Sequence, residues 1–587
     1  MEWLRKRAVV GGVAASVVFL SCSSDLSDAS ESSDAGSQDA GTTDDRSQDA
    51  DTRDTGADAE TDAGTDAGTA DGGGDAGCGS GVTPEPGLVV TDKGAVRGVQ
   101  SGDSWAFLGI PYAAPPVGEL RYRPPVEPGC LAGTLQAVAF REKCLQLDEN
   151  GDPAAMEGSE DCLVLNVWTP AGYAPGAGLP VLAFIHGGGH MTGSASEQAK
   201  DGQYIYDGSR LAVKANAVVV TMNYRLNAFG FVAHRALSAE SGYGGSGNYG
   251  TMDQIAAFRW VRQNAAAFGG DPAKVLLFGE SAGAVQTCMN VVSPLSTGLF
   301  RAALMESGAC TAKTLAEAEA FGAQFAEAAG CDSAPDVPAC LRALTAEQVV
   351  KAYPQKVSVA GKSGGYQPNV DGHVIPEKPA DMFRKGTHNR VPLVVGANSD
   401  ETSRWVPQIT EEQYEQMVLA LVAGYQPLAD AILAEYPSSD YGGSPRLAYI
   451  VASTDAKFIC TARTAARAAD EGQDEPVYRY LYSHALENGG AALKALGAYH
   501  GSELPLVFGN LTFQGYVPTA GEAALSDAVI GYWSRLAATG DPNGGGAPEW
   551  PVLGGTLDAY LRLDDPMETG QGIRTAKCDF WDTLIPQ

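Results

Sequence analysis

The pentapeptide G-E-S-A-G occupies Gly279 to Gly283, between an apolar run, V-L-L-F, and the stretch A-V-Q-T-C-M-N-V. It fits G-x-S-x-G, the sharp strand-to-helix turn that lifts a nucleophilic serine hydroxyl out of an α/β sheet. Glycines at both ends let neighbouring backbone pass close to this strained turn. Short glycine–serine stretches are common, so the motif alone does not assign catalysis. It predicts an α/β fold in which a strand ends, and a helix begins, at Ser281.

A glycine loop precedes this turn in the chain. The run L-P-V-L-A-F-I-H-G-G-G-H extends from Leu179 to His190, so that an apolar strand ends in three glycines. Acyl transfer needs backbone N–H groups aimed at the developing oxyanion, and glycines let the substrate carbonyl approach them. H-G-G-G is the form of this loop in lipases and esterases, and the residue after the nucleophile, here Ala282, supplies another N–H. The two motifs together predict an acyl-transfer site.

A nucleophilic serine needs an acid and then a histidine further along the chain. Among the seven histidines, His500 lies between glycines on a predicted loop, in L-G-A-Y-H-G-S-E. His484 ends an apolar strand and is expected to be structural, and the other five lie in the glycine loop or before a suitable acid. The run V-P-L-V-V-G-A-N-S-D-E-T places Asp400 and Glu401 just beyond a buried strand. Either carboxylate could orient the imidazole.

Further motifs accompany these residues, among them F-L-G-I-P-Y-A-A-P-P-V-G at 107–118, S-E-D-C-L-V-L-N at 159–166, V-V-T-M-N-Y-R-L at 219–226, G-N-Y-G-T-M-D-Q at 247–254, W-V-R-Q-N-A-A-A-F-G-G-D-P at 260–272 and G-D-P-N-G at 540–544. The set resembles the type-B carboxylesterase family, which includes the cholinesterases and fungal lipases. The resemblance extends from Val89 to Pro586. It implies an α/β-hydrolase fold: a mostly parallel central sheet flanked by helices, with large insertions.

The resemblance also implies a role for each residue of the site. The expected roles are Ser281 as nucleophile, Glu401 as acid and His500 as base; Gly188, Gly189 and Ala282 as oxyanion-hole donors; and Gly187, Glu280 and Ser307 as supporting residues. Members of the family usually read D-E-G where this chain has D-E-T. Thr402 therefore keeps Asp400 open as an alternative acid.

The cysteines indicate an oxidising compartment. The chain has 11 cysteines, and ten remain when Cys22 is set aside. An even number in an exported chain indicates disulfides, and no pair has the C-x-x-C spacing of a zinc site. The resemblance implies the pairs Cys144–Cys162, Cys331–Cys340 and Cys460–Cys578, and elimination adds Cys288–Cys310 and Cys78–Cys130. No metal or organic cofactor is expected.

Residues 1–22 are typical of an export signal. A basic start, Glu2 to Arg7, precedes an apolar run of thirteen residues, Ala8 to Leu20. This run is short for a membrane span of about 20 residues and fits a signal peptide. The ending F-L-S-C resembles the lipobox of bacterial lipoproteins, although Phe19 stands where leucine is usual. We expect export and lipid anchoring through Cys22, at the outer membrane if the host has one; the alternative is ordinary cleavage and secretion.

Residues 23–77 consist almost wholly of Asp, Ala, Gly, Thr and Ser, with sixteen acidic residues against two arginines. Such a segment cannot bury enough apolar surface to offset its ordering entropy, so we expect a disordered linker. Residues 78–587 then form the predicted hydrolase domain, with a net charge of −19. An acidic domain argues against nucleic-acid binding, which needs a basic surface. Membrane contact is expected only through the N-terminal anchor.

These motifs predict a serine carboxylesterase that hydrolyses a small-molecule ester through an acyl-enzyme. A lipase or an amidase with the same triad is the alternative, because fold does not set substrate. A non-catalytic adhesion module is disfavoured because all three triad positions are filled. A choline esterase is disfavoured because the segment from Cys144 to Cys162 has no aromatic residue, whereas cholinesterases place a cation-binding tryptophan there.

Overall fold

The computed structural model describes residues 78, 81–361 and 364–584 of the chain. The predicted signal peptide (1–22), its Cys22 and the predicted linker (23–77) lie outside the described residues. Within the described ranges, no helix combines the length and the apolar character needed to cross a membrane.

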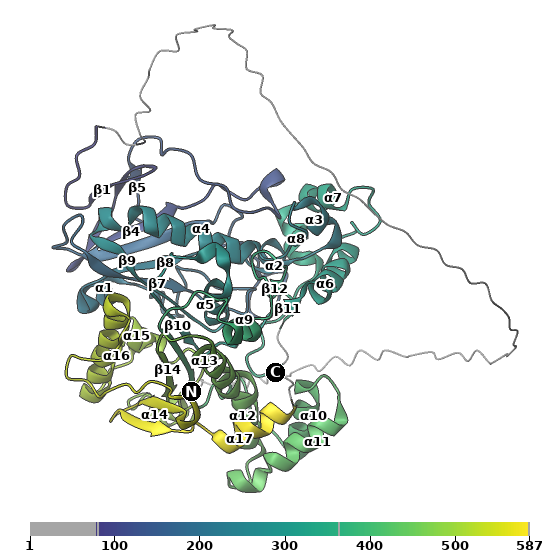
Figure 1. Ribbon diagram of the computed structural model, residues 1–587. Helices are drawn as coiled ribbons and strands as arrows, with labels where there is room; N and C mark the ends of the chain where they lie inside the picture. Colours follow the sequence, from purple (N-terminus) through teal and green to yellow (C-terminus); the bar gives the residue numbers. More distant parts are fainter. Residues whose placement is uncertain (1–77, 79–80, 362–363, 585–587) are drawn as a thin grey trace, which may run out of the picture. The chain divides into compact units, whose positions relative to one another are not determined.

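A twisted mixed sheet runs through the domain (Figure 1). Its eleven strands, all within the described part of the chain, lie in the spatial order β16 (Glu568–Gln571), β15 (Ala559–Leu563), β14 (Val477–Tyr482), β13 (Leu393–Asn398), β10 (Ala302–Glu306), β9 (Gly270–Glu280), β7 (Leu179–Ile185), β8 (Val218–Met222), β6 (Val164–Pro170), β4 (Ser104–Pro111) and β3 (Val99–Ser101). The strands from β15 to β8 are mutually parallel. Antiparallel pairs extend the sheet at both ends.

The central strands are apolar because both faces of the sheet are covered. β7 reads L-P-V-L-A-F-I and β8 reads V-V-V-T-M, and most of these side chains are buried. Parallel sheets with helices on both faces need such continuous apolar strands. One apolar core joins the sheet to α4 (Tyr249–Asn264), α5 (Ala282–Val292), α9 (Pro379–Lys385) and α13 (Cys460–Gly472). A second core joins the opposite face to α1 (Ser209–Ala215), α15 (Leu504–Val507) and α16 (Ala520–Thr539).

Two long insertions interrupt the alternation of strands and helices. Between β10 and β13 the chain forms α6 (Leu315–Ala328), α7 (Val337–Ala343) and α8 (Ala346–Ala352). Between β13 and β14 it forms α10 (Glu411–Leu421), α11 (Gln426–Glu435), α12 (Pro445–Thr454) and the π-helix η5 (Asp455–Ile459), which continues into α13. The second group packs with α17 (Thr575–Leu584) around a third apolar core (Figure 1).

Short elements complete the described chain. The strands are β1 (Leu88–Thr91), β2 (Gly94–Arg97) and β5 (Leu135–Gln136) in one small sheet, and β11 (Lys313–Thr314) with β12 (Asn369–Val370) in another. The helices are η1 (Gly118–Leu120), α2 (Asn227–Phe231), α3 (Arg235–Glu240), η2 (Ala265–Phe268), η3 (Pro294–Ser296), η4 (Ser438–Tyr441), α14 (Gly490–Lys494), η6 (Phe513–Gly515) and η7 (Gly555–Leu557).

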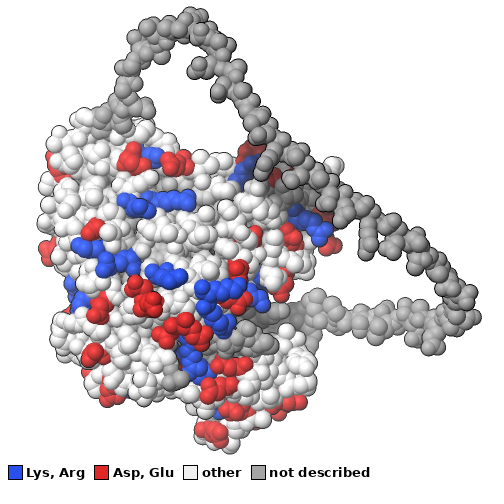
Figure 2. All heavy atoms as spheres, in the orientation of Figure 1, with Lys and Arg blue, Asp and Glu red and all other residues white. Residues whose placement is uncertain are grey.

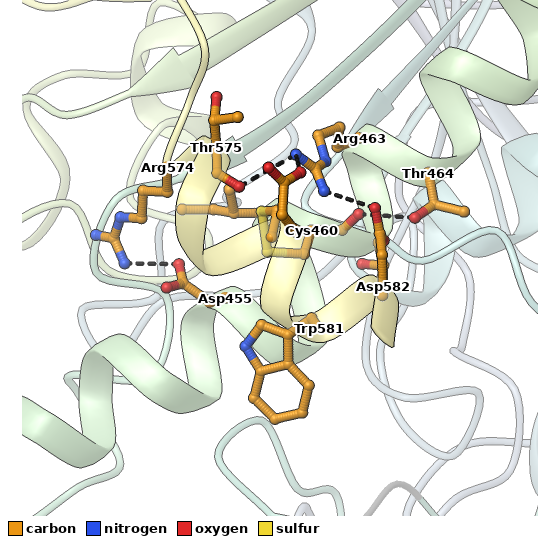
Figure 3. Close-up of a disulfide and its surroundings, with 12 residues drawn as sticks. Asp455, Cys460, Arg463, Thr464, Arg574, Thr575, Trp581 and Asp582 are labelled. Carbon is orange, nitrogen blue, oxygen red and sulfur yellow. Dashed lines mark hydrogen bonds and ion pairs between the residues drawn. A yellow bond between two sulfur atoms is a disulfide. The ribbon is translucent and has the colours of Figure 1, made fainter. Parts of the chain in front are cut away.

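Five disulfides join the ten described cysteines. They are Cys78–Cys130, Cys144–Cys162, Cys288–Cys310, Cys331–Cys340 and Cys460–Cys578, the same five pairs that the sequence analysis expects. The last pair fastens α17 to the start of α13 (Figure 3). Beside it, buried Arg463 on α13 donates to Asp582 at 2.6 Å, and Arg574 forms an ion pair with Asp455 of η5 at 2.7 Å.

Basic and acidic side chains are interspersed over the face of the domain drawn in Figure 2. Large uncharged areas separate them. On this face the charges are therefore mixed at short range rather than gathered into one broad region of a single sign.

Candidate active site

Ser281 occupies the turn between β9 and α5. Its backbone has φ 57° and ψ −122°, a strained conformation for a residue with a side chain, which costs on the order of 1–3 kcal/mol. The Ser281 N–H donates to the carbonyl of Glu306 at 2.9 Å, which helps to hold the turn. A Cβ on Gly283 would lie 1.9 Å from the Ile185 carbonyl oxygen, so only glycine lets α5 approach β7 this closely. The turn therefore presents the serine at the carboxyl end of the parallel strands.

Glu401 and His500 meet at the same edge of the sheet. Glu401 follows β13 and is fully buried. Its Oε2 lies 2.6 Å from Nδ1 of His500, and its Oε1 accepts the Asn398 N–H at 2.8 Å. The backbone N–H of His500 also donates to the backbone carbonyl of Glu401 at 3.0 Å. A carboxylate on Nδ1 fixes the tautomer that leaves Nε2 free to accept a proton.

Asp400, the alternative acid, faces elsewhere. Its Oδ2 accepts from the Ser399 hydroxyl and from the Ala498 N–H at 3.3 Å. Between the two adjacent carboxylates, it is Glu401 that contacts His500. Thr402 is buried beside them, with its hydroxyl 2.8 Å from that of Ser453.

The second imidazole nitrogen faces Glu280. His500 Nε2 lies 3.2 Å from Oε1 of Glu280, but in the described residues it has no partner with hydrogen-bond geometry. The ring packs against Phe458 at 5.0 Å and Trp405 at 6.1 Å, measured between ring centres. In the neutral form of His500, Nε2 is thus free to accept a proton.

Buried carboxyl groups set the electrostatics of this histidine. Burial favours the neutral imidazole, but the carboxylates of Glu280 and Glu401 outweigh it and raise the pKa of His500 to about 9. Burial raises the pKa of Glu280 to about 7; the nearby Glu401 acts in the same direction, and His500 opposes them. Because Glu280 and His500 interact directly, their proton equilibria are linked.

Two further carboxyls lie behind the site. Burial, followed by the charges of Glu280 and Glu401, raises the pKa of Glu503 to about 8, and its carboxyl accepts from the Asn398 amide. Burial raises the pKa of Glu306 well above its ordinary value, and its Oε1 accepts the Trp533 indole N–H at 3.0 Å. Both pKa shifts favour the neutral carboxyl over the carboxylate, which limits the negative charge gathered around Glu401.

The glycine loop and the serine line one cavity of about 590 Å³. Its lining includes Ser281, Ser307 and His500. It also includes the three residues expected to form the oxyanion hole, Gly188, Gly189 and Ala282. In the described chain, no acceptor engages the N–H groups of these three residues. A Cβ on Gly187 would lie 2.8 Å from Glu280 Oε2 and 2.9 Å from the Ser281 Cβ, so this position needs glycine. The Ser307 hydroxyl, also in the cavity wall, has no hydrogen-bond partner among the described residues.

The two insertions supply much of the remaining wall. Arg404, Trp405, Lys457 and Phe458 come from the segment between β13 and α13. Lys457 Nζ donates to three backbone carbonyls, those of Ser358, Val359 and Gly361, at 2.7–2.9 Å. Burial lowers its pKa to about 8, against the attraction of Glu401.

Sequence reasoning missed these wall residues and the carboxyls of Glu306 and Glu503. Glu503 had a signal, because it follows His500 by three residues. Lys457 and Phe458 had none, because they reach the site only through the packing of the insertion.

His484 is structural, as expected: its ring contacts Asp564 at 3.1 Å and Glu522 at 3.2 Å. In the part of the chain that the structure covers, no group of three or more His, Cys, Asp or Glu residues is arranged to hold a metal ion.

Comparison with known proteins gives the family of the chain. The model of the "Carboxylesterase family" matches residues 85–581. The cocaine esterase of Homo sapiens is 33% identical over 540 residues, covering 85% of this chain and 90% of that protein. The fumonisin B1 esterase of Sphingopyxis macrogoltabida is 36% identical over 484 residues, covering 80% of this chain and 85% of that protein.

A solved structure shares the fold. The structure of PNB esterase superimposes with a TM-score of 0.71 at 32% identity, covering 85% of this chain and all of that one. The family match extends over most of the chain, and the sheet order, the nucleophile turn and the glycine loop lie within it. The chain belongs to the carboxylesterase family.

Proposed function

We propose that this carboxylic-ester hydrolase works through an acyl-enzyme formed on Ser281, with His500 as the base and Glu401 as the acid that orients it. The observation that supports this most strongly is the 2.6 Å contact between Glu401 Oε2 and His500 Nδ1, in the wall of the cavity that Ser281 also lines. A buried carboxylate on one nitrogen and a free second nitrogen are what the base of a serine hydrolase needs.

In this mechanism His500 Nε2 takes the Ser281 proton while the hydroxyl oxygen attacks the ester carbonyl carbon. The N–H groups of Gly188, Gly189 and Ala282 stabilise the oxyanion that develops. The proton then passes from Nε2 to the leaving alcohol, and the acyl group stays on Ser281. Water attacks the acyl-enzyme with His500 again as the base, which releases the acid and restores the serine.

The proposed substrates are carboxylic esters small enough to enter a cavity of about 590 Å³, which is within the range of drug-sized ligand sites. Two relatives are named as esterases of particular compounds, cocaine and fumonisin B1, which supports small-molecule esters as substrates. A p-nitrophenyl ester series of increasing acyl length tests this: an esterase of this kind loses kcat/KM at long chains, and a lipase gains it.

Substitution of the nucleophile tests the mechanism. We expect Ser281→Ala to lose essentially all hydrolysis of p-nitrophenyl butyrate and to keep the far-ultraviolet circular dichroism of the unaltered protein. His500→Ala should be about as damaging, because triad residues act as a unit, and Glu401→Gln should retain somewhat more activity. Substantial turnover by folded Ser281→Ala would refute the proposed role of the serine.

The disulfides indicate that the chain is an exported or extracellular protein, because such bonds persist in oxidising compartments. We propose further that Cys22 is lipidated and anchors the enzyme to the bacterial cell envelope, on the outer membrane where the host has one. The F-L-S-C ending of the apolar run supports this.

Fractionation of cells that express the full chain tests the anchor. The unaltered chain should partition with membranes and enter the detergent phase, while Cys22→Ala should be soluble or remain unprocessed. An unaltered chain found wholly in the soluble exported fraction would mean that Cys22 is discarded with an ordinary signal peptide.

A further inference from the structure

The loop after Glu401 brings a cation to the wall of the ester cavity. Arg404 is exposed and lines the cavity together with Ser281 and His500. Its guanidinium carbon lies 5.5 Å from the centre of the Trp405 ring and 5.8 Å from that of Tyr499. The Trp405 ring in turn lies edge-on to the His500 ring at 6.1 Å. One aromatic ring therefore separates the guanidinium from the base of the triad.

The donors of Arg404 are free in the described chain. No carboxylate there lies at ion-pair distance from its guanidinium, and no carbonyl accepts its N–H groups. Cation–π attraction to the two rings uses none of the N–H groups of the guanidinium, which stay available for hydrogen bonds. These N–H groups match a carboxylate in two parallel hydrogen bonds.

The backbone that carries Arg404 is held in place. Arg446 of α12 donates to the Ser403 carbonyl at 2.7 Å and to the Val406 carbonyl at 2.8 Å, on either side of Arg404. The Trp405 N–H donates to the Thr402 carbonyl at 3.0 Å. With the backbone of the loop held and the Tyr499 ring buried, a ligand of Arg404 would meet a partly oriented group, which lowers the entropy cost of binding.

The charges of the cavity wall support an anion at this place. Its basic residues are Lys200, Arg404 and Lys457, and its acidic ones are Glu149 and Glu280. The Lys457 ammonium donates to three backbone carbonyls, so it contributes positive charge but has no donor left for a ligand. Arg404 contributes positive charge and, among the described residues, also has free N–H donors. The whole chain has a net charge of −31, and so large a negative charge repels anions in general. The guanidinium of Arg404, unpaired in the described chain, is therefore a local exception in an acidic protein.

We propose that Arg404 forms an anion subsite of the ester cavity, and that the enzyme prefers esters that carry a free carboxylate on their acyl or alcohol part. The carboxylate accepts two N–H groups of the guanidinium while the ester carbonyl lies at Ser281. This inference rests on the proposed function and adds the substrate class to it.

Two matched pairs of esters test the subsite. The acyl pair is mono-p-nitrophenyl glutarate and its neutral methyl ester; the alcohol pair is 4-acetoxybenzoate and its neutral methyl ester. The quantity measured is the ratio of kcat/KM for the charged ester to that for its neutral partner. Arg404→Gln should lower this ratio by about tenfold or more in at least one pair, as expected when a charge-assisted hydrogen bond is lost.

Further variants separate charge from geometry. Arg404→Lys should lower the ratio less than Arg404→Gln does, because it keeps the charge but loses the paired donors. Arg235→Gln removes an exposed arginine of α3 outside the cavity lining and should leave the ratio unchanged. Raising the salt concentration should also lower the ratio of the unaltered enzyme, because salt screens an exposed ion pair.

The pair that responds identifies the part of the substrate that carries the carboxylate. If Arg404→Gln leaves the ratio unchanged in both pairs, the subsite does not exist. If the unaltered enzyme hydrolyses none of the four esters, the proposed function fails instead, so the two failures can be told apart.

Discussion

In the proposed mechanism His500 determines the pH range in which the site can work, because only its neutral imidazole accepts a proton. Glu280 and Glu401 contact its two ring nitrogens, and Glu503 adds a smaller electrostatic effect; the charges of Glu280 and Glu401 outweigh burial and raise its pKa to about 9. We therefore expect kcat/KM for a neutral ester to rise with pH through an apparent pKa well above 6.5. The pH profile of kcat/KM with p-nitrophenyl acetate, corrected for spontaneous hydrolysis, measures this apparent pKa.

Glu280→Gln is the informative variant for this profile. It removes one carboxylate 3.2 Å from Nε2 of His500, so the pKa of His500 should fall. The rising part of the pH profile should then move to lower pH by about one unit or more. Glu415→Gln removes an exposed carboxylate on α10 and serves as the control. A rising part that stays in place in Glu280→Gln would show that Glu280 does not act on the base.

At the residue scale, the sequence predicted the groups that belong to motifs and left open those that depend on side-chain direction. Ser281 and the glycine loop could be located because their backbone demands fix residue types. Asp400 and Glu401 were equivalent in sequence, since both follow the same strand, and only the path of the chain after β13 turns Glu401 toward His500. Arg404 could not be predicted as a cavity residue because Tyr499, one of the two rings beside its guanidinium, is distant in sequence.

At the element scale, the π-helix η5 connects the C-terminal helix to the cavity. It carries Lys457 and Phe458 into the cavity wall. Directly after it, the Cys460–Cys578 disulfide fastens α17, and Arg574 pairs with Asp455 of η5 (Figure 3). This disulfide closes a segment of 118 residues. It therefore links the stability of the C-terminal helix to the shape of the site.

Removal of this disulfide should affect both stability and activity. We expect the double variant Cys460→Ala, Cys578→Ala to lose about 2–4 kcal/mol of unfolding free energy and to have a lower kcat/KM, because η5 is held less firmly. The matched control is the double variant Cys331→Ala, Cys340→Ala, whose disulfide joins residues only nine apart in sequence. Its loss of unfolding free energy should be smaller. Denaturant unfolding, followed by tryptophan fluorescence, measures the difference; an equal or larger loss in the control would contradict this account.

The strands were easier to predict than the insertions. β7, β9 and β13 lead into the glycine loop, the Ser281 turn and the segment with Glu401, so their apolar runs could be recognised from the motifs that follow them. The helices from α10 to α12 have no such markers. Their packing around the third core decides which side chains reach the cavity, and sequence periodicity does not give that information.

At the scale of the whole molecule, the disulfides predict a domain without free thiols. After export, the ten described cysteines should all be paired. Thiol labelling of the unfolded, unreduced mature protein should give little signal, and labelling after reduction should give a strong one. Two or more reactive thiols before reduction would contradict the pairing.

The proposed mechanism depends most on the identity of the nucleophile, which a phosphonate probe tests directly. A p-nitrophenyl phosphonate ester transfers its phosphonyl group to an activated serine and releases one equivalent of p-nitrophenol. Intact-mass and peptide mass spectrometry should find one phosphonyl group per chain, on the peptide that contains Ser281, and none in Ser281→Ala. A stoichiometric adduct on any other residue, together with loss of ester hydrolysis, would contradict the assignment of Ser281 and with it the mechanism.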